Sequence, residues 1–182
     1  EECFQKFAEL ELTDLFETKK LAQVCVSRGW ASPDHLGTWD DLFFLVMLNA
    51  VEPKLAGLGK PVIVYLYPES QAALSNIITD SRGFRWAKRF EVYAGGLELG
   101  NAFDELTDPI EQRVRFKKDM ELRKAIYGNS FPPNPIDEEF LKDLSKMPPS
   151  AGIAMGVDRM VMYFTGTKDI QDVLWLQSFN CR

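Results

Sequence analysis

Three glutamates recur at seven-residue spacing in the stretch "RFEVYAGGLELGNAFDEL", residues 89–106: Glu91, Glu98 and Glu105. The stretch reads as two strands joined by a glycine turn, which is typical of a β-hairpin. Carboxylates brought together on a hairpin repel one another, and a divalent cation is the simplest compensation. Mg²⁺ suits them, because it takes hard oxygen ligands and commonly binds one or two carboxylates together with substrate phosphates. Glu91 and Glu98 therefore look like half of a metal and nucleotide site.

The position of the turn decides whether these two carboxylates meet. A loop centred after Ala94 makes Glu91 and Glu98 directly opposed, with Cβ atoms roughly 4.5 to 5.5 Å apart. The dipeptide Gly95-Gly96 is the stronger turn signal. A loop centred there pairs Glu98 with Tyr93 instead, so both registers stay open at this point.

The second strand of the hairpin carries a further set of polar and aromatic residues. Simple alternation places Asn101, Phe103 and Glu105 on one face and Glu98 on the other. A bulge at Gly100 would re-aim one set toward a common pocket. An amide, an aromatic ring and a carboxylate on one face suit a ligand with an ammonium group and an aliphatic stem. The alternative is a row of exposed glutamates on the rim of a sheet.

A second candidate site lies in "GIAMGVDR", residues 152–159. Small residues in a strand allow a flat group to lie against the backbone. Arg159, in the first turn of the following helix, can clamp a phosphate or a carboxylate with two hydrogen bonds. The alternative is a glycine-rich crossing strand followed by a surface ion pair between Asp158 and Arg159.

Composition limits the chemistry that these residues can take part in. The 182 residues are 46% hydrophobic and 26% charged, as expected of one globular domain covering 1–182. The single histidine, His35, nearly excludes chemistry based on Ser/His/Asp, Cys/His or several histidine metal ligands. Three cysteines without CxxC spacing favour a reducing cytoplasm. The net charge is −6 and no stripe of basic residues is present, so the sequence shows no surface for binding nucleic acid. No apolar run is long enough for a membrane span.

The hydrophobic pattern predicts helices and strands that do not alternate regularly. We expect an α+β domain with a mostly antiparallel sheet flanked by helices. The predicted strands lie at 60–68, within 89–106 and near 151–156, and the predicted helices lie at about 13–27, 38–51, 109–128, 137–147 and from 158 onward.

The helix at 109–128 has the clearest start signal. Asp108 is a good N-cap, Pro109 suits the first helical position, and an acid follows three residues after the cap. Phe116, Met120 and Tyr127 then share one face, which we interpret as a core stripe. The basic run "RFKKDMELRK" within this helix is interpreted as its solvated face.

Two segments together resemble the C-terminal half of a class II aminoacyl-tRNA synthetase catalytic domain, in its lysine branch. "RFEVYAGGLELGNAFDELTDPIEQRVRF" is similar to the lysine-pocket hairpin and following helix of that family, and "PPSAGIAMGVDRMVMYFTG" is similar to its motif 3. The match runs in order from about Lys60 to Leu176. The resemblance implies formation of an aminoacyl-adenylate from an amino acid and ATP, with Mg²⁺ as cofactor.

The resemblance also assigns roles to individual residues. It implies that Mg²⁺ bridging the ATP phosphates is held by Glu91 and Glu98. The expected amino-acid pocket consists of Asn101, Phe103 and Glu105, with Glu105 accepting the side-chain ammonium. Gly156 would lie under the adenine, and Arg159, as the catalytic residue, would contact the γ-phosphate region. The full set expected at ATP is Glu98, Leu99, Gly156 and Arg159.

Several features resemble the elongation factor P lysine ligase more than lysyl-tRNA synthetase. They are "YPESQAAL", "NPIDEEFLKDL" and Ala154, which stands where motif 3 usually begins with glycine. Gln171 occupies a position where the synthetase usually has arginine, which puts the contact of that arginine in doubt. The resemblance implies lysine or β-lysine as substrate, and elongation factor P or lysine tRNA as acceptor.

Two family motifs are not found in the sequence. They are motif 1, the usual dimerisation element, and motif 2, whose arginine contacts the α-phosphate. "GFRWAKRF" contains Phe84-Arg85 but lacks the required acid. Because the chain also begins at Glu1, we expect a segment of a longer cytoplasmic enzyme, a homodimer in its full-length form, and we expect the segment to be hardly active alone. The alternatives are a non-catalytic synthetase-like module that binds an amino acid or a partner, and a true lysyl-tRNA synthetase.

Overall fold

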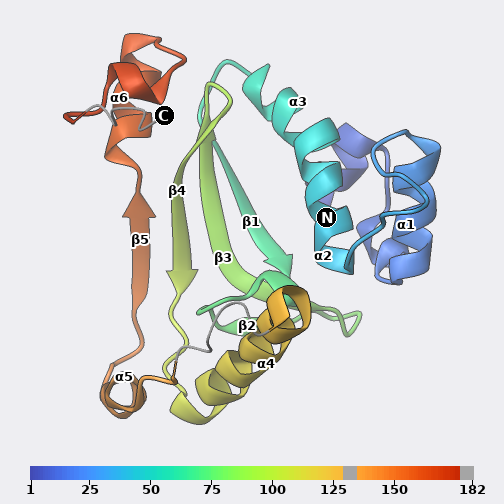
Figure 1. The fold of residues 1–182 in the computed structure, drawn as a ribbon. Coiled ribbons are helices and arrows are strands. Elements are labelled where there is room, and N and C mark those ends of the chain that lie inside the picture. Colours follow the sequence, from blue (N-terminus) through green and yellow to red (C-terminus); the bar gives the residue numbers. More distant parts are fainter. Residues whose placement is uncertain (129–134, 177–182) are drawn as a thin grey trace.

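The computed structural model describes residues 1–128 and 135–176, and it has the expected α+β architecture (Figure 1). An antiparallel sheet forms the centre, with strand order β1-β3-β4-β5, and β2 pairs with one end of β3. The strands are β1 (Val62–Pro68), β2 (Ile77–Thr79), β3 (Arg85–Ala94), β4 (Leu97–Asp104) and β5 (Ala151–Met155). The helices are α1 (Thr18–Ser27), α2 (Trp39–Val46), α3 (Glu52–Ala56), α4 (Pro109–Tyr127), α5 (Glu138–Leu144) and α6 (Val157–Thr165). No helix in the described ranges is long and apolar enough to cross a bilayer.

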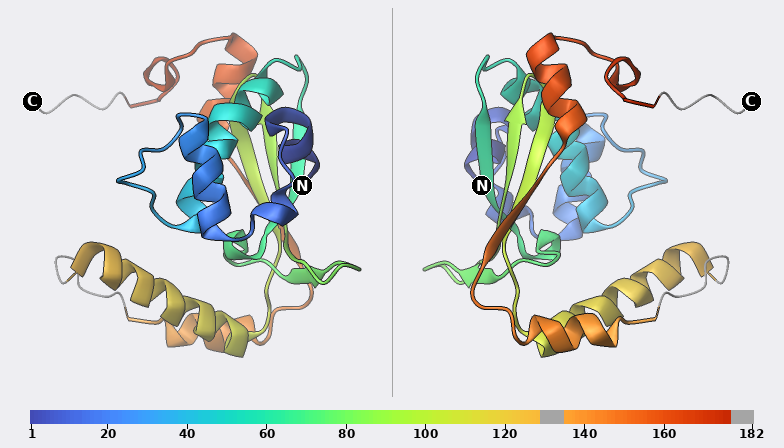
Figure 2. Two further views of the ribbon diagram at one scale, coloured as in Figure 1. Left: turned by 90° about the vertical axis from the view of Figure 1, so that its right-hand side faces the viewer. Right: turned by 90° about the vertical axis from the view of Figure 1, so that its left-hand side faces the viewer.

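The hydrophobic core lies between the N-terminal helices and one face of β1 and β3. Figure 2 shows α1 and α2 packed beside this part of the sheet, while β5 and α6 extend beyond it. The ring of Phe43 on α2 is at the centre, with its centroid 5.1 Å from Phe4, 5.4 Å from Trp39 and 6.4 Å from Tyr67. The core therefore anchors β1 and β3, which carry one side of the candidate site.

The predicted helix over 38–51 is divided in the structure. Thr38 and Asp41 form a reciprocal capping box at the start of α2. The helix continues through a π-turn, Met47–Val51, into α3, which ends at Ala56. A Cβ added to Gly96 would lie 3.4 Å from the Ala56 Cβ. The end of α3 therefore packs against the turn of the β3–β4 hairpin.

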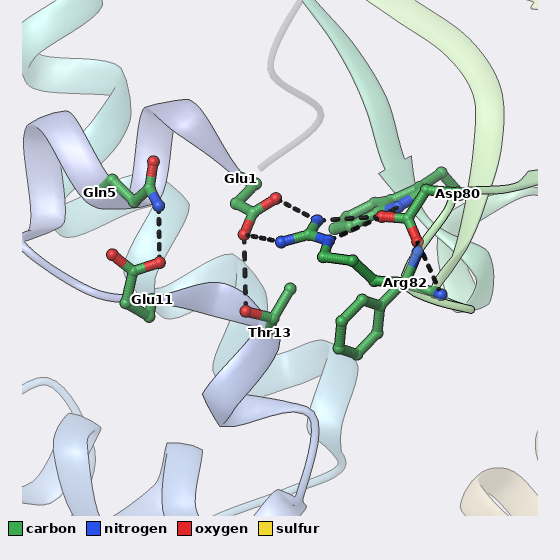
Figure 3. Close-up of polar contacts among 8 residues, drawn as sticks. Glu1, Gln5, Glu11, Thr13, Asp80 and Arg82 are labelled. Carbon is green, nitrogen blue, oxygen red and sulfur yellow. Dashed lines mark hydrogen bonds and ion pairs between the residues drawn. The ribbon is translucent and has the colours of Figure 1, made fainter.

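The N-terminus is attached to the sheet by a polar cluster around Arg82 (Figure 3). Its Nη1 and Nη2 atoms donate to the Glu1 carboxylate at 3.0 and 2.6 Å, and Nη2 also donates to Asp80 at 2.9 Å. The indole Nε1 of Trp86 donates to the same aspartate at 3.1 Å. This cluster joins the first turn of the chain to the connection between β2 and β3.

Helix α4 begins as predicted, but its expected core stripe is wrong. The Asp108 side chain accepts hydrogen bonds from two backbone N–H groups of the first turn. Only Gln112 of this helix is buried, and Tyr127 is 52% exposed. Figure 2 shows α4 standing apart from the main helical layer, and Phe116 packs against Phe140 of α5 with ring centroids 6.0 Å apart. Phe116 thus contacts a neighbouring helix and not the core, while the basic run is mostly exposed as expected.

Candidate functional site

The β3–β4 hairpin turns at Gly95-Gly96, which settles the register that the sequence left open. Both glycines have positive φ, 58° and 82°, as this tight turn requires. Tyr93 therefore pairs with Glu98, and Glu91 pairs with Asn101. The two glutamates are not directly opposed.

A bulge in β4 nevertheless brings the predicted site residues to one face. Val92 pairs with Gly100 and Tyr93 with Glu98, so Leu99 is the extra residue, directly before the position expected for the bulge. Residues paired in an antiparallel ladder project to the same side, and an extra residue shifts the alternation by one. Glu98 consequently lies on the face that carries Glu91, Asn101 and Phe103. The expected separation of Glu98 from the other residues by simple alternation does not occur.

Glu91 is the most completely partnered carboxylate of this face. It is 8% exposed, and its Oε2 accepts hydrogen bonds from the phenols of Tyr67 and Tyr93, both at 2.6 Å. Its Oε1 forms an ion pair with Arg89. Burial and then the nearby Glu91 charge raise the pKa of Tyr67, and burial and the hydrogen bond to Glu91 raise that of Tyr93. Both phenols therefore stay protonated and act as donors.

Arg89 connects this acid to the neighbouring aromatic residue. Its guanidinium carbon lies 4.7 Å from the ring centroid of Tyr67 and 5.3 Å from that of Phe103. Nη1 donates to the backbone oxygen of Gln71 at 3.0 Å. Stacking of a guanidinium between two rings is favourable and restricts their orientation. The Phe103 ring is thus positioned by the same arginine that neutralises Glu91.

The residues predicted for an amino-acid pocket follow one another along this face. Asn101 and Phe103 are half-buried on β4, and Glu105 follows directly after the strand. They are successive same-face positions, about 7 Å apart along the chain. The Asn101 Oδ1 atom is buried without a hydrogen-bond partner in the described part of the chain.

Glu105 contrasts with Glu91, because its half-buried carboxylate has no hydrogen bond or ion pair with any described residue. A Cβ added to Gly152 would lie 2.6 Å from the Glu105 Oε1 atom. The carboxylate therefore rests in space that only glycine leaves open. The β5 partners of the two preceding residues are also small, since Phe103 pairs with Gly152 and Asn101 with Ala154.

The second candidate site joins the first through Arg159. Its Nη1 donates to the backbone oxygen of Glu98 at 2.9 Å and lies 3.5 Å from the Glu98 carboxylate. The expected alternative, an ion pair with Asp158, is not the pairing found. Arg159 lines an open cleft of 470 Å³ together with Leu97, Met162, Lys168, Asp169 and Ile170.

The start of α6 is fixed to the bulge. Gly156 is the N-cap residue of α6, and its N–H donates to the backbone oxygen of Leu99 at 2.9 Å. Gly156 and Leu99, both expected at ATP, therefore meet beside Glu98 and Arg159. The structure brings together the residues named from the glycine-rich segment and those named from the hairpin.

Glu52 is a further acid of this region that the sequence patterns did not indicate. It lies one helical turn before Ala56, so it shares the face of α3 that packs on the hairpin. Burial, and then the charges of Glu91 and Glu98, raise the pKa of the Glu52 carboxyl. The position of Glu52 depends on how α3 packs against the hairpin, which no local sequence motif encodes.

The donor set fits Mg²⁺ if substrate oxygens complete its coordination. Within residues 1–128 and 135–176, no three Asp, Glu, His or Cys side chains gather closely enough to hold an ion by themselves. Mg²⁺ is usually bound through one or two carboxylates plus phosphates and water. Glu98 accepts from fewer groups and has lone pairs to spare, whereas Glu91 already accepts from three donors and keeps about one of the roughly four lone-pair positions of a carboxylate.

Comparison with known proteins finds relatives that share one name. The elongation factor P–(R)-β-lysine ligase of Proteus mirabilis is 46% identical over 136 residues, which cover 74% of this chain and 40% of that protein. The ligase of the same name from Erwinia tasmaniensis is 38% identical over 177 residues, covering 96% and 52%. The one from Edwardsiella ictaluri is 44% identical over 136 residues, covering 74% and 40%. The chain spans about half or less of the length of these curated relatives.

The matched region contains every element described above for the site. The family model of the tRNA synthetases class II (D, K and N) matches residues 44–178, which run from α2 through the hairpin to the segment after α6. Since that match covers most of the sequence, the chain belongs to the class II tRNA synthetases (D, K and N).

Proposed function

We propose that the full-length protein is an ATP-dependent ligase that activates lysine or β-lysine and transfers it to a lysine side chain of elongation factor P. The observation that carries the proposal is the bulge at Leu99, which places Glu98, Asn101 and Phe103 on one face with Glu91. The relatives that match at 38–46% identity bear the name of this activity. Elongation factor P, and not tRNA, is the acceptor that those names favour.

In the proposed reaction, one face of β4 orients both substrates. The amino-acid carboxylate attacks the α-phosphorus of ATP, the bond to the β-phosphate oxygen breaks, and pyrophosphate leaves. Arg159 is a fixed cation that can neutralise phosphate charge, and it is already aligned by the Glu98 backbone oxygen. Gly156 and Ala154 leave room for a flat base against the backbone. Mg²⁺, held at Glu98 with Glu91 as its proposed second ligand, would supply charge neutralisation at the phosphates.

The other end of the row would select the amino acid. Phe103 offers an apolar surface for an aliphatic stem, and the unpartnered Glu105 carboxylate offers acceptors for an ammonium group. Because the nucleotide end and the ammonium end lie on one strand, the substrate carboxylate would be directed toward the α-phosphate. Positioning and electrostatic stabilisation would supply most of the rate acceleration.

The test is Glu105→Gln in the full-length protein, with lysine-dependent exchange of pyrophosphate into ATP as the readout. The substitution removes the charge that would pair with the ammonium, so we expect KM for lysine to rise by at least about thirtyfold. Glu121→Gln on the exposed surface of α4 is the matched control and should leave the exchange unchanged. Unchanged exchange in Glu105→Gln would remove the pocket assignment.

A second candidate, lysyl-tRNA synthetase, follows from the matched family model, which includes enzymes of that class. The two activities share adenylate formation and differ in the acceptor. Incubation of the full-length protein with labelled lysine, ATP and either acceptor separates them. Label on elongation factor P supports the proposal, whereas label on lysine tRNA would replace it with the synthetase.

A further inference from the structure

Lys168 is an exposed cation that shares a cleft with Arg159. Both side chains line the open cleft of 470 Å³ between the start of β4, α6 and the segment that follows α6. The other lining residues are Leu97, Met162, Asp169 and Ile170. Within residues 1–128 and 135–176, the Lys168 ammonium has no hydrogen-bond or ion-pair partner. The cleft therefore carries two cations, and the ammonium of one of them is available to an anion.

The segment that carries Lys168 is held in place by its own hydrogen bonds. The Thr167 hydroxyl donates to the Asp172 carboxylate at 2.8 Å. The Asp169 carboxylate accepts from the Gln171 backbone N–H at 2.9 Å. Because these two acids bind groups of their own segment, they fix the backbone on both sides of Lys168 and leave its ammonium unpaired.

Arg159 also has donors to spare. Its Nη1 donates to the Glu98 backbone oxygen at 2.9 Å, and the side chain is 48% exposed. A guanidinium has five N–H donors, so most of them remain for a ligand. An arginine binds phosphate oxygens through two parallel hydrogen bonds, whereas a lysine acts as a mobile point charge on a flexible stem. A ligand with several anionic oxygens can therefore engage Arg159 and Lys168 together.

Apolar side chains form much of the cleft wall. Met162 is buried, and Leu97 and Ile170 add further apolar surface. Cations in a cleft with apolar walls focus their electric field, so they attract anions more strongly than the same charges on an open surface. Asp169 offsets part of this field, but one of its oxygens already accepts the Gln171 N–H. With two cations and one acid among the lining residues, the cleft favours a polyanion.

We propose that Lys168 is a second phosphate-binding cation of the site and that it holds, together with Arg159, the pyrophosphate that leaves ATP. This inference rests on the proposed function and deepens it. When an oxygen of the amino-acid carboxylate bonds to the α-phosphorus, the bridging oxygen keeps the electron pair of the breaking bond and leaves with the pyrophosphate. Arg159 is fixed beside Glu98, whereas the longer reach of a mobile lysine lets Lys168 follow the departing group.

The experiment is Lys168→Met in the full-length protein, with lysine-dependent exchange of pyrophosphate into ATP as the readout. Methionine keeps most of the apolar stem and removes the charge. KM for pyrophosphate should rise about fivefold at low salt, which is the size expected of one solvent-exposed ion pair. KM for lysine should stay unchanged, because the amino acid binds at the Asn101–Phe103 end of the row.

Calorimetric titration with inorganic pyrophosphate adds a readout that does not depend on turnover. Its Kd should rise by the same factor in Lys168→Met, and the difference from the wild type should shrink as salt is added. Lys168→Arg keeps the charge and should restore most of the binding. A merely structural role of the side chain would not produce this salt dependence.

Lys118→Met is the matched control, because Lys118 is also exposed and lies on α4. Figure 1 shows α4 at the opposite end of the sheet from α6. The variant removes the same charge from the same protein at a remote position. Its KM and Kd for pyrophosphate should equal those of the wild type, and an equal loss in both variants would mean that net charge alone acts.

The outcomes separate this inference from the proposed function. A wild type without lysine-dependent exchange would end both. An active wild type and a Lys168→Met variant with the same KM and Kd for pyrophosphate would overturn only the role of Lys168. A rise in KM for lysine as large as the rise for pyrophosphate would also overturn it, because the effect would then not be confined to the phosphates.

Discussion

Glu91 and Glu105 lie on the same face of one hairpin and its extension, but their surroundings are opposite. Glu91 is buried and accepts from Arg89 and two phenols, whereas Glu105 is half-buried and has no polar partner among the described residues. A fully partnered buried carboxylate contributes to the folded state, and its removal leaves its partners unpaired. An unpartnered one contributes little to folding and is available to a ligand. The comparison separates the part of the site that the fold needs from the part that it leaves open.

The largest expected effect is on stability at the Glu91 end. Glu91→Gln leaves Arg89 as a buried cation without its ion-pair partner, and the free energy of unfolding should fall by about 3–5 kcal/mol. Glu105→Gln should change it by less than about 1 kcal/mol. Urea denaturation of both variants measures the difference. If both variants unfold at the same urea concentration, partner number does not distinguish the two acids.

An intermediate effect is expected where the Glu105 carboxylate meets β5. In Gly152→Ala the new Cβ would take the space of the Glu105 Oε1 atom, so the carboxylate must swing away. KM for lysine should rise roughly tenfold, while the free energy of unfolding changes by about 1 kcal/mol or less, because the obstacle is the end of a flexible side chain. The control is Gly57→Ala, where the Cβ makes an ordinary contact at 3.5 Å. An unchanged KM would mean that the position of Glu105 does not matter to the ligand.

The smallest effect concerns Asp80, which is as well partnered as Glu91 but lies near the surface. Partial burial acts to raise its pKa, but hydrogen bonds from Trp86, Arg82 and the Phe84 backbone outweigh burial and lower the pKa to about 2. A carboxyl whose pKa is lowered on folding adds stability above its unfolded pKa, near 3.8, and that contribution disappears as pH falls toward 2.

Stability measured between pH 4 and 2 should therefore fall less steeply in Asp80→Asn than in the wild type. Parallel curves for the two proteins would show that the hydrogen bonds in Figure 3 do not act on this carboxyl in solution. An effect at Asp80 that is smaller than the effect at Glu91 would indicate that burial adds to the contribution of the hydrogen-bond partners.

Local patterns predicted most of the elements and the shared face of several residues of the candidate site. The Asp108-Pro109 signal located the start of α4, and strand alternation placed Asn101, Phe103 and Glu105 on one face. Such features depend on neighbours within a few positions. The turn could not be chosen from neighbouring residues alone, since loops centred after Ala94 and at Gly95-Gly96 were both compatible with the sequence. Pairing of the two strands selects Gly95-Gly96.

Features that depend on distant segments were not predictable in this way. The partners of Glu91 include Tyr67 from β1, and the neighbour of Glu105 is Ser75 from a connecting segment. Glu52 reaches the region only because α3 packs against the hairpin turn. The expected core stripe on α4 failed for a related reason: helical spacing shows that side chains share a face, but not whether another layer covers it.

The bulge at Leu99 has a consequence for the numerical pattern of the three glutamates. Seven is an odd interval, and in a regular strand it would send Glu98 and Glu105 to opposite sides of the sheet. Leu99, the extra residue of the bulge, shifts the alternation by one, so the two glutamates can lie on the same side. Deletion of Leu99 would therefore be far more damaging than a conservative replacement there. It would turn Glu98 to the face opposite Asn101, Phe103 and Glu105 without removing any acid.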